Sequence, residues 1–251
     1  MNQTMSQAMS QATPGKTAGL LESAVLKLFT RSATVLDIEE VGAAFRIVTL
    51  GGPALRDTGW TPGDKIQLQF GGWVQRTYTP IDWDMAAGRT RILVYLLAGG
   101  PGAQWGRNVQ TGDECIVFGP RKSVRIARPQ SPVILCGDET SLGLAAALTR
   151  RVPAPVHTLF EVSSLADTQP VLERLQLANA RVCARSGSEE HLPALETQMA
   201  ALLRLRPSAD IVLTGKAGTI QHLGRALRQA GVAAGRRQSK AYWAPGKTGL
   251  D

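Results

Sequence analysis

The sequence predicts a six-stranded antiparallel β-barrel followed by a five-stranded parallel α/β domain. Short strand-like runs separated by glycine and proline turns occupy residues 33–118, which is typical of a small barrel. From Pro132 onward apolar strands alternate with helical segments, the pattern of a parallel sheet covered on both faces. The chain of 251 residues is long enough for two cores, and we place the boundary near residues 128–131.

The barrel domain is predicted to span residues 20–128. Apolar residues at helical spacing from Leu20 to Phe29 predict a short amphipathic helix before its first strand. A second short helix is expected from Pro101 to Val109, with its proline in the first turn. The six predicted strands are Ala33–Ile38, Ala44–Leu50, Lys65–Phe70, Val74–Thr79, Arg91–Leu97 and Glu114–Phe118.

The α/β domain is predicted to span residues 129–251, with no internal repeat. Its strands are expected at Val133–Cys136, Val156–Val162, Ala180–Ala184, Ile211–Thr214 and Ser239–Trp243. Its helices are expected at Ser141–Arg150, Pro170–Ala178, Glu189–Leu205 and Ile220–Ala230.

Residues 1–19 lack the basic start and apolar centre of a signal peptide, and we expect a disordered leader. No apolar run approaches the roughly 20 residues that span a bilayer. We therefore expect a cytoplasmic protein without stable membrane insertion. A monomer is a separate expectation.

The net charge of +8 favours an anionic partner: a nucleotide, an acidic small molecule, nucleic acid or a membrane surface. The basic residues form short groups without interleaved aromatic residues, so we do not expect nucleic-acid binding. The three cysteines are odd in number and unpaired in spacing, which indicates reduced thiols. The three histidines have no ligand spacing to them, so no metal site is expected.

The strand ending at Thr79 carries an arginine two residues before a tyrosine. Alternation along a strand places Arg76 and Tyr78 on one face and Thr77 and Thr79 on the other. A fixed cation beside an aromatic ring suits a ligand that has both a phosphate and a planar ring. Taken alone, the same residues fit an ordinary edge strand.

The first α/β strand leads through Gly137 directly into a helix. Ligands of such sheets lie beyond the carboxyl ends of the strands, and the helix N-terminus suits an anionic or polar ligand. A capped turn without a ligand is the alternative. Ser141 occupies the position of a hydrolase nucleophile, but Glu139 replaces the glycine of the Gly-x-Ser-x-Gly motif.

Five short motifs occur in order along these two predicted domains. They are Arg76-Thr77-Tyr78-Thr79, Gly100-Pro101-Gly102-Ala103-Gln104-Trp105, Phe118-Gly119-Pro120-Arg121, Gly137-Asp138-Glu139-Thr140 and Tyr242-Trp243 with Pro245-Gly246. From about Ala33 to Gly246 the chain thereby resembles the siderophore-interacting protein family. These are FAD-binding ferric reductases related in architecture to ferredoxin–NADP reductases.

The resemblance implies that FAD is seated on the strand that ends at Thr79. Arg76 would pair with the pyrophosphate, Tyr78 would pack on the isoalloxazine ring, and Thr79 would hydrogen-bond near its reactive nitrogen. Thr77 lies between them in the same motif. The turn formed by Ala98, Gly99, Gly100, Pro101 and Gly102 would contact the pyrophosphate and ribityl through its backbone, which glycine permits.

The resemblance also implies a nucleotide site at the Gly137–Thr140 turn. Asp138, Glu139 and Thr140 would face the flavin and receive the nicotinamide, which makes Thr140 a catalytic candidate beside Thr79. Tyr242 or Trp243 would shield the far face of the flavin.

Two basic residues at strand ends are candidates for substrate or nucleotide binding. Lys216 could contact an anionic substrate, with an exposed loop lysine as the equal alternative. Arg185 could contact a nucleotide phosphate, with a surface arginine as the alternative.

The implied function is an FAD-dependent oxidoreductase that reduces a ferric siderophore or other ferric chelate with electrons from NAD(P)H or a ferredoxin. The alternatives are a flavin-dependent reductase with another acceptor, and a flavin- or siderophore-binding protein without turnover. The chain departs from the family at Ala98, where many members have histidine, and at Ile81 or Asp82, where many have a basic residue. It also has Lys216 in a turn where the family often has glutamate.

Overall fold

The computed structural model describes residues 30–71 and 74–247. The predicted leader and the helix predicted at Leu20–Phe29 lie outside the described residues. The described residues from Arg31 onward belong to one unit that contains both sheets. Among the described residues no helix is long and apolar enough to cross a membrane.

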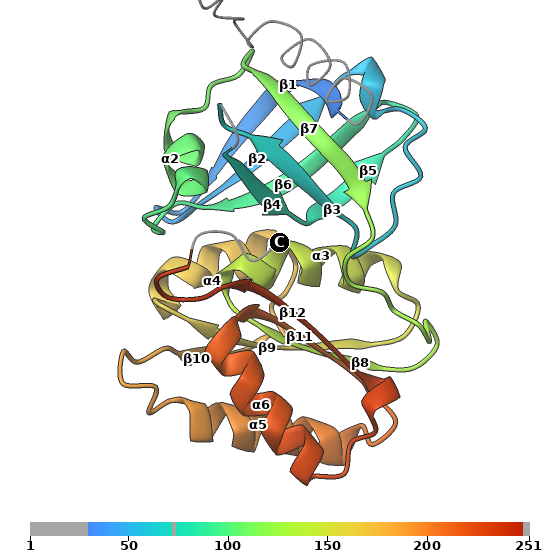
Figure 1. The fold of residues 1–251 in the computed structure, drawn as a ribbon, viewed down its shortest axis with the longest axis vertical. Coiled ribbons are helices and arrows are strands. Elements are labelled where there is room, and N and C mark those ends of the chain that lie inside the picture. Colours follow the sequence, from blue (N-terminus) through green and yellow to red (C-terminus); the bar gives the residue numbers. More distant parts are fainter. Residues whose placement is uncertain (1–29, 72–73, 248–251) are drawn as a thin grey trace, which may run out of the picture. The chain divides into compact units, whose positions relative to one another are not determined.

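The first sheet is antiparallel and has seven strands in the order β4-β3-β7-β1-β2-β6-β5 (Figure 1). Helix α2 (Pro101–Asn108) lies between β6 and β7 in the chain. A short 3₁₀ turn, η1, spans Pro53–Leu55. The strands are β1 (Thr30–Val41), β2 (Phe45–Gly51), β3 (Lys65–Gln69), β4 (Gln75–Tyr78), β5 (Pro80–Asp84), β6 (Arg89–Tyr95) and β7 (Glu114–Arg121).

The prediction of an antiparallel β domain is confirmed, but the number of six strands is wrong. The missed strand is β5, which begins immediately after the strand predicted to end at Thr79. Proline is compatible with the first residue of an edge strand because no ladder hydrogen bond from its nitrogen is needed there. β5 is an edge strand in the sheet order, pairs with β6, and begins at Pro80.

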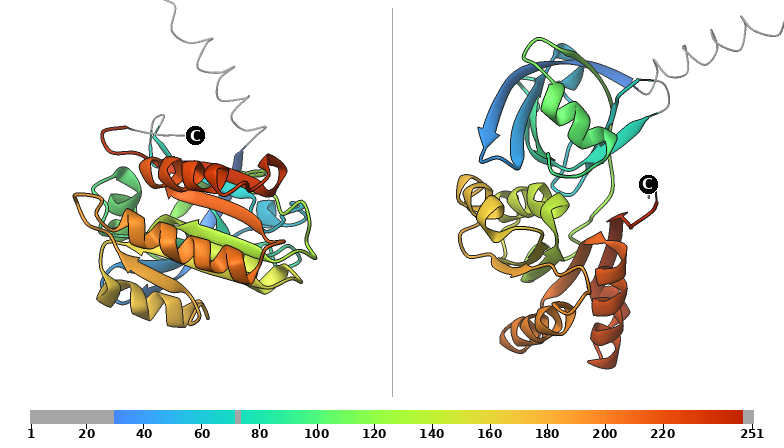
Figure 2. Two further views of the ribbon diagram at one scale, coloured as in Figure 1. Left: turned by 90° about the horizontal axis from the view of Figure 1, so that it is seen from below. Right: turned by 90° about the vertical axis from the view of Figure 1, so that its left-hand side faces the viewer.

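The second sheet is parallel, with five strands in the order β10-β9-β8-β11-β12, as predicted. Helices α3 and α4 lie on one face, and α5 and α6 on the other (Figures 1 and 2). The strands are β8 (Val133–Gly137), β9 (Val156–Val162), β10 (Arg181–Ala184), β11 (Asp210–Lys216) and β12 (Arg237–Trp243). The helices are α3 (Leu142–Arg151), α4 (Leu165–Arg174), α5 (Leu192–Leu205) and α6 (Ala217–Gln229), with 3₁₀ turns η2 (Glu139–Ser141) and η3 (Ala234–Arg236).

Helix α4 begins earlier than the predicted segment Pro170–Ala178. Ser164 caps the helix by accepting a hydrogen bond from the Asp167 N–H, and Pro170 lies inside it. We had treated the proline as a helix start, whereas the serine cap supplies that signal.

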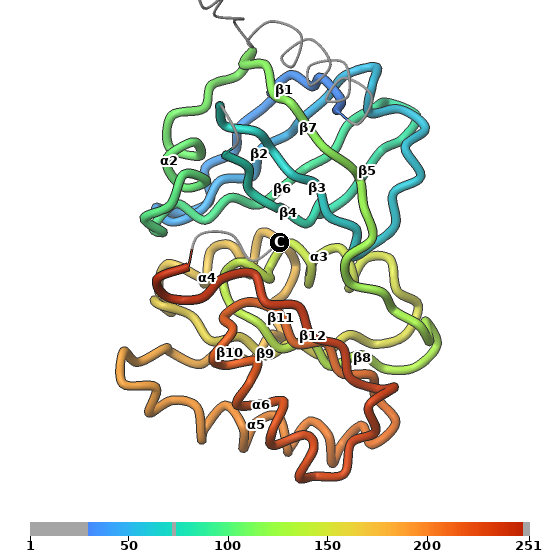
Figure 3. Tube along the Cα trace, in the orientation of Figure 1, coloured from blue at the N-terminus to red at the C-terminus, as the bar shows by residue number. Residues whose placement is uncertain are grey.

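Three apolar clusters fill the described part of the chain. One fills the antiparallel sheet domain and includes Trp60 and Trp83. Another lies under α5 and α6. The third joins Phe45 of β2 and Ile81 of β5 to Leu142 of α3, so the two sheets share buried contacts through α3. Figure 3 follows the chain from β7 into β8 across this region. The domain boundary near residues 128–131 stays a prediction.

Candidate functional site

Strand β4 presents the predicted arginine and tyrosine from the edge of the antiparallel sheet. Arg76 pairs in register with Leu68 of β3, and Tyr78 pairs with Ile66. Among the described residues Arg76 has no acidic partner; its Nη1 donates 2.6 Å to the carbonyl of Gln75. Within the described part of the chain the cation is therefore not neutralised by a carboxylate and is available to an anion.

Helix α2 begins directly beside these two side chains. A Cβ built on Gly102 would lie 2.8 Å from Tyr78 Oη and 3.3 Å from Arg76 Cγ. The helix has no side-chain cap and no acidic residue in its first turn. Its free N–H groups and the positive end of its dipole therefore lie next to Arg76, an arrangement that favours a phosphate group.

The turn before α2 is open on its outer side. Cβ atoms built on Gly99 and Gly100 would meet nothing within 4 Å among the described atoms, and Ala98 and Gly99 are exposed. A ligand backbone can therefore approach this turn closely. The structure thus brings together the two segments that the sequence analysis had assigned to one ligand.

Two aromatic rings support Tyr78 in this arrangement. Trp105 of α2 lies 6.3 Å from the Tyr78 ring and stacks on Phe70 at 5.1 Å. Burial raises the pKa of the Tyr78 phenol, and the nearby Arg76 charge opposes this to a smaller extent. Tyr78 is therefore a neutral, half-buried ring at neutral pH. From the sequence, Trp105 was identifiable only as part of a motif, and Phe70 was missed because its aromatic character was its one signal.

The chain breaks its strand geometry at Thr79, a residue that regular alternation places on the face opposite Arg76 and Tyr78. β4 ends at Tyr78, β5 begins at Pro80, and the pairing of β5 with β6 shifts register between Pro80 and Asp82. The Thr79 carbonyl lies 3.0 Å from a Cβ built on Gly143 of α3. Helix α3 therefore packs closely on the end of the Arg-Thr-Tyr-Thr motif.

These residues fit FAD. Arg76 and the start of α2 would hold the pyrophosphate, and Tyr78, supported by Trp105, would lie against the flavin ring. Asp82, one of the two positions at which the resemblance leads us to expect a basic residue, pairs with Arg91. The individual roles of Thr77, Thr79 and Ala98 stay predictions.

A second group of polar residues lies at the carboxyl ends of the parallel strands. Asp138 follows β8 and is fully buried; it accepts hydrogen bonds from the Thr140 N–H at 2.9 Å and from Trp243 Nε1 at 2.7 Å. The Thr140 hydroxyl donates to the same carboxylate. Burial raises the pKa of Asp138 to about 6, although the hydrogen bonds from Thr140 and Trp243 act in the opposite direction. The Gly137–Thr140 motif therefore fixes β12, the last strand of the parallel sheet, to the turn that follows β8.

Arg185 lies between two buried carboxylates. Its Nη2 donates to Glu139, and its Nε lies 3.8 Å from Glu161 Oε2. Glu139 and Glu161 are 3% and 1% exposed in their side chains. The guanidinium also lies 5.4 Å from the Trp243 ring, within cation–π range. Arg185 is thus not the plain surface arginine of the alternative reading, and its charge is already compensated by these acids.

The network continues into α5 and α6 through residues that the sequence analysis had not singled out for this role. His191 Nδ1 accepts from the Ser186 N–H at 3.2 Å, so its Nε2 carries the hydrogen that Glu161 accepts at 2.6 Å. Thr219 donates to the other oxygen of Glu161 at 2.6 Å. Glu161 lies within an apolar strand run, and a charge in such a run was the available signal.

Lys216 is the last residue of β11 and is buried. The alternative prediction, that it is an exposed loop lysine, is therefore wrong. Its Nζ donates 2.7 Å to Glu189. Tyr242 and Trp243 belong to β12, and the indole of Trp243 joins Asp138 as described above. The structure therefore gathers Asp138, Glu139, Arg185 and Trp243 at one edge of the sheet.

Ser141 does not resemble a nucleophile. It is fully buried and accepts hydrogen bonds from Thr214 Oγ1 at 2.8 Å and from the Asp138 N–H at 3.4 Å. With Asp138 it forms a capping box at the start of η2. The hydrolase alternative therefore has no support in the described residues, and no group of three potential metal ligands occurs there.

Comparison with known families gives a match to each of the two domains. Residues 70–124 match the siderophore-interacting FAD-binding domain, and residues 130–246 match the siderophore-interacting protein model. The chain belongs to the siderophore-interacting protein family. The two matches run in the order in which the site motifs occur, and the first includes Arg76, Tyr78 and Gly102.

Solved structures of this family are similar to the chain over most of its length. A siderophore utilization protein from T. fusca has 23% identity and a TM-score of 0.71, with 88% of this chain and 95% of that one covered. The siderophore-interacting protein SipS from Aeromonas hydrophila has 24% identity and a TM-score of 0.71, with 87% and 93% covered.

More distant similarity extends to reductases. The ferredoxin reductase in carbazole 1,9a-dioxygenase has 16% identity and a TM-score of 0.68, with 85% of this chain and 69% of that one covered. No curated protein sequence matches the chain. The family match and the ferredoxin reductase-like fold together support flavin-dependent electron transfer.

Proposed function

We propose that this protein is an FAD-dependent oxidoreductase that reduces a ferric siderophore, or another ferric chelate, with electrons from NAD(P)H or a reduced ferredoxin. The observation that carries the proposal is the convergence of Arg76, Tyr78 and the uncapped start of α2 within a matched FAD-binding domain. The chemistry that FAD supplies when bound is the acceptance of two electrons from a donor and their transfer, one at a time, to iron. Reduction to the ferrous state weakens binding by hard oxygen ligands and releases the metal.

The residues of the chain have binding and orienting roles in this scheme. Arg76 and the α2 N–H groups neutralise the pyrophosphate, which anchors the cofactor. Tyr78 provides an apolar contact for the ring and stays neutral. Thr79, at the strand break, has a hydroxyl within the motif that can donate to the ring edge.

The carboxyl-end network would serve the donor side of the reaction. Thr140 is exposed while its hydroxyl and N–H both bond to Asp138, so the turn is held in one conformation. Trp243 is held by Asp138 and by the Arg185 guanidinium. A nicotinamide that enters beside this turn would meet a preorganised surface, and Lys216 is a candidate contact for an anionic substrate.

The test is an anaerobic half-reaction experiment on purified protein that carries FAD. NADH, NADPH and a reduced ferredoxin are each mixed with the oxidised protein, and bleaching of the flavin absorbance is followed. We expect at least one donor to bleach the flavin faster than it does free FAD. Ferric chelates are then added to the reduced protein, and the rate of reoxidation is compared with that given by oxygen.

Each outcome distinguishes one alternative. A protein that binds FAD and is bleached by none of the donors is a binding protein without turnover. A protein that is bleached, but is reoxidised by no ferric chelate faster than by oxygen, is a flavin-dependent reductase with another acceptor. Loss of FAD from Arg76→Ala, with retention by the exposed control Gln104→Ala in α2, supports the assigned cofactor site.

A further inference from the structure

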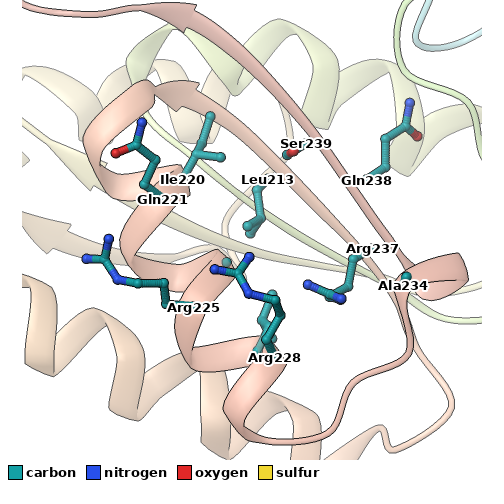
Figure 4. A pocket seen from close by; sticks show the side chains of 11 residues that line it. Leu213, Ile220, Gln221, Arg225, Arg228, Ala234, Arg237, Gln238 and Ser239 are labelled. Atoms are coloured by element: carbon teal, nitrogen blue, oxygen red, sulfur yellow. The ribbon is translucent and has the colours of Figure 1, made fainter.

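A pocket lies between α6 and β12 (Figure 4), and none of the residues that line it belongs to either group of site residues. It has a volume of about 490 Å³, within the usual range for small-ligand sites. Its base is formed by the apolar residues Leu213, Ile220 and Leu227. Three arginines also line it, which are Arg225 and Arg228 of α6 and Arg237 at the start of β12.

The arginines of the pocket have no carboxylate partners. Among the described residues, the side chains of Arg225, Arg228 and Arg237 form no ion pair or hydrogen bond. The Nε of Arg237 is buried and has no hydrogen-bond partner. Buried polar atoms in proteins are nearly always satisfied, so an unsatisfied donor at a pocket wall indicates a missing acceptor.

The neighbouring arginine shows that this is not a general property of the region. Arg236 donates from Nε and Nη2 to the carbonyl of Ala209 at 3.1 and 2.6 Å. Arg128, in the segment that precedes β8, pairs with Asp210 of β11. The fold therefore engages the arginines that serve structure and leaves those of the pocket available.

The charge of the surrounding sequence and the shape of the pocket also favour an anionic ligand. Residues 211–250 contain seven Lys and Arg residues and neither Asp nor Glu. Gly224 keeps the helix surface open at the pocket, since a Cβ there would meet only Arg228 Nη1, at 3.8 Å. Figure 4 shows the Arg237 side chain extending from β12 toward α6, where Arg228 lies. Two guanidinium groups so arranged can hold two neighbouring anionic groups at once.

We propose that the α6–β12 pocket binds a compact oligoanion, with neighbouring phosphate or carboxylate groups held by Arg228 and Arg237 and any small apolar body resting on the base. This binding site is separate from the flavin and donor sites, and it does not depend on the function proposed above. An extended polyanion is disfavoured because the arginines line a bounded pocket rather than a track.

The test is isothermal titration calorimetry of the full-length, FAD-loaded protein at low chloride concentration. Pyrophosphate, ADP and citrate are the probes, which separate an oligophosphate from a nucleotide and from a polycarboxylate. We expect one equivalent of at least one probe to bind. Arg228→Gln and Arg237→Gln should each weaken its binding by about tenfold or more, because each removes a charge-assisted pair of hydrogen bonds.

Two further variants make the result specific. Arg204→Gln removes the same charge from an exposed position in α5 and should change the affinity by no more than about twofold. Gly224→Glu adds a carboxylate where there is space for it, and it should block the pocket without a loss of flavin content. Because Gly224→Glu improves helix propensity, it keeps the proposal testable if an arginine variant folds poorly.

The proposal is overturned if no probe binds the wild-type protein. It is also overturned if all four variants bind alike, which would indicate general attraction to a basic surface. Binding to anionic vesicles or to an oligonucleotide, but to no small probe, would assign the arginines to a macromolecular surface and reject a small-ligand pocket.

Discussion

Gly102 is the position at which the two halves of the proposed flavin site touch, and Gly102→Ala is a sharp test of that geometry. The added Cβ would lie 2.8 Å from Tyr78 Oη and 3.3 Å from Arg76 Cγ, and the first distance is too short to persist. Tyr78 cannot move freely because Trp105 packs against it. The substitution therefore displaces the tyrosine, the arginine or the start of α2, and each of these is a proposed FAD contact.

The expected change in the free energy of unfolding is the sum of two opposing effects. Overpacking of this kind costs about 1–3 kcal/mol. Replacement of glycine by alanine in a helix returns up to about 1 kcal/mol of backbone stability. The free energy of unfolding should therefore fall by no more than about 3 kcal/mol. The strain falls on the residues that hold the cofactor, so FAD affinity should fall by about 5- to 150-fold.

The assay is fluorescence titration of the flavin-free protein with FAD, together with urea unfolding. The control is Gln104→Ala, an exposed substitution in the same helix that adds no contact. If Gly102→Ala binds FAD as tightly as the wild type and the control do, α2 does not meet the Arg-Thr-Tyr-Thr strand as described. The flavin site would then have to be sought elsewhere.

Three other outcomes are expected. Arg185→Ala leaves Glu139 and Glu161 buried without a cation, so it should lower the free energy of unfolding by about 3–5 kcal/mol in urea titrations, whereas the exposed Arg204→Ala should have little effect. The raised pKa of Asp138, about 6 against about 3.9 in the unfolded chain, means that its stabilising contribution is complete below about pH 4 and is lost as pH rises to about 6. Urea titrations across that window should show a loss of up to about 3 kcal/mol that disappears in Asp138→Asn and persists in Glu190→Gln; an unchanged slope in Asp138→Asn would contradict the assignment. A Cβ on Gly143 would lie 3.0 Å from the Thr79 carbonyl, so Gly143→Ala should alter the flavin absorbance spectrum of the loaded protein, and an identical spectrum would show that α3 does not constrain Thr79.

The site strand could be found from the sequence because its chemistry is local. Arg76 and Tyr78 lie two residues apart, and alternation alone puts them on one face. The glycine turn before α2 and the Gly137–Thr140 turn were also identifiable, because glycine and capping residues mark such turns directly. The order of strands and helices followed from the change in hydrophobic period near Pro132.

Pairings between distant residues could not be predicted in this way. Arg185 meets Glu139 across 46 positions, and Trp243 meets Asp138 across 105 positions. Likewise, Pro80 opens a strand because β5 lies at a sheet edge, a position that depends on the tertiary pairing with β6. Local periodicity determines which segments are strands and helices, but only packing decides which charged side chains are compensated. For the same reason the sequence showed a basic C-terminal segment, and the tertiary structure decided that Arg228 and Arg237 line one pocket while Arg236 bonds to the backbone.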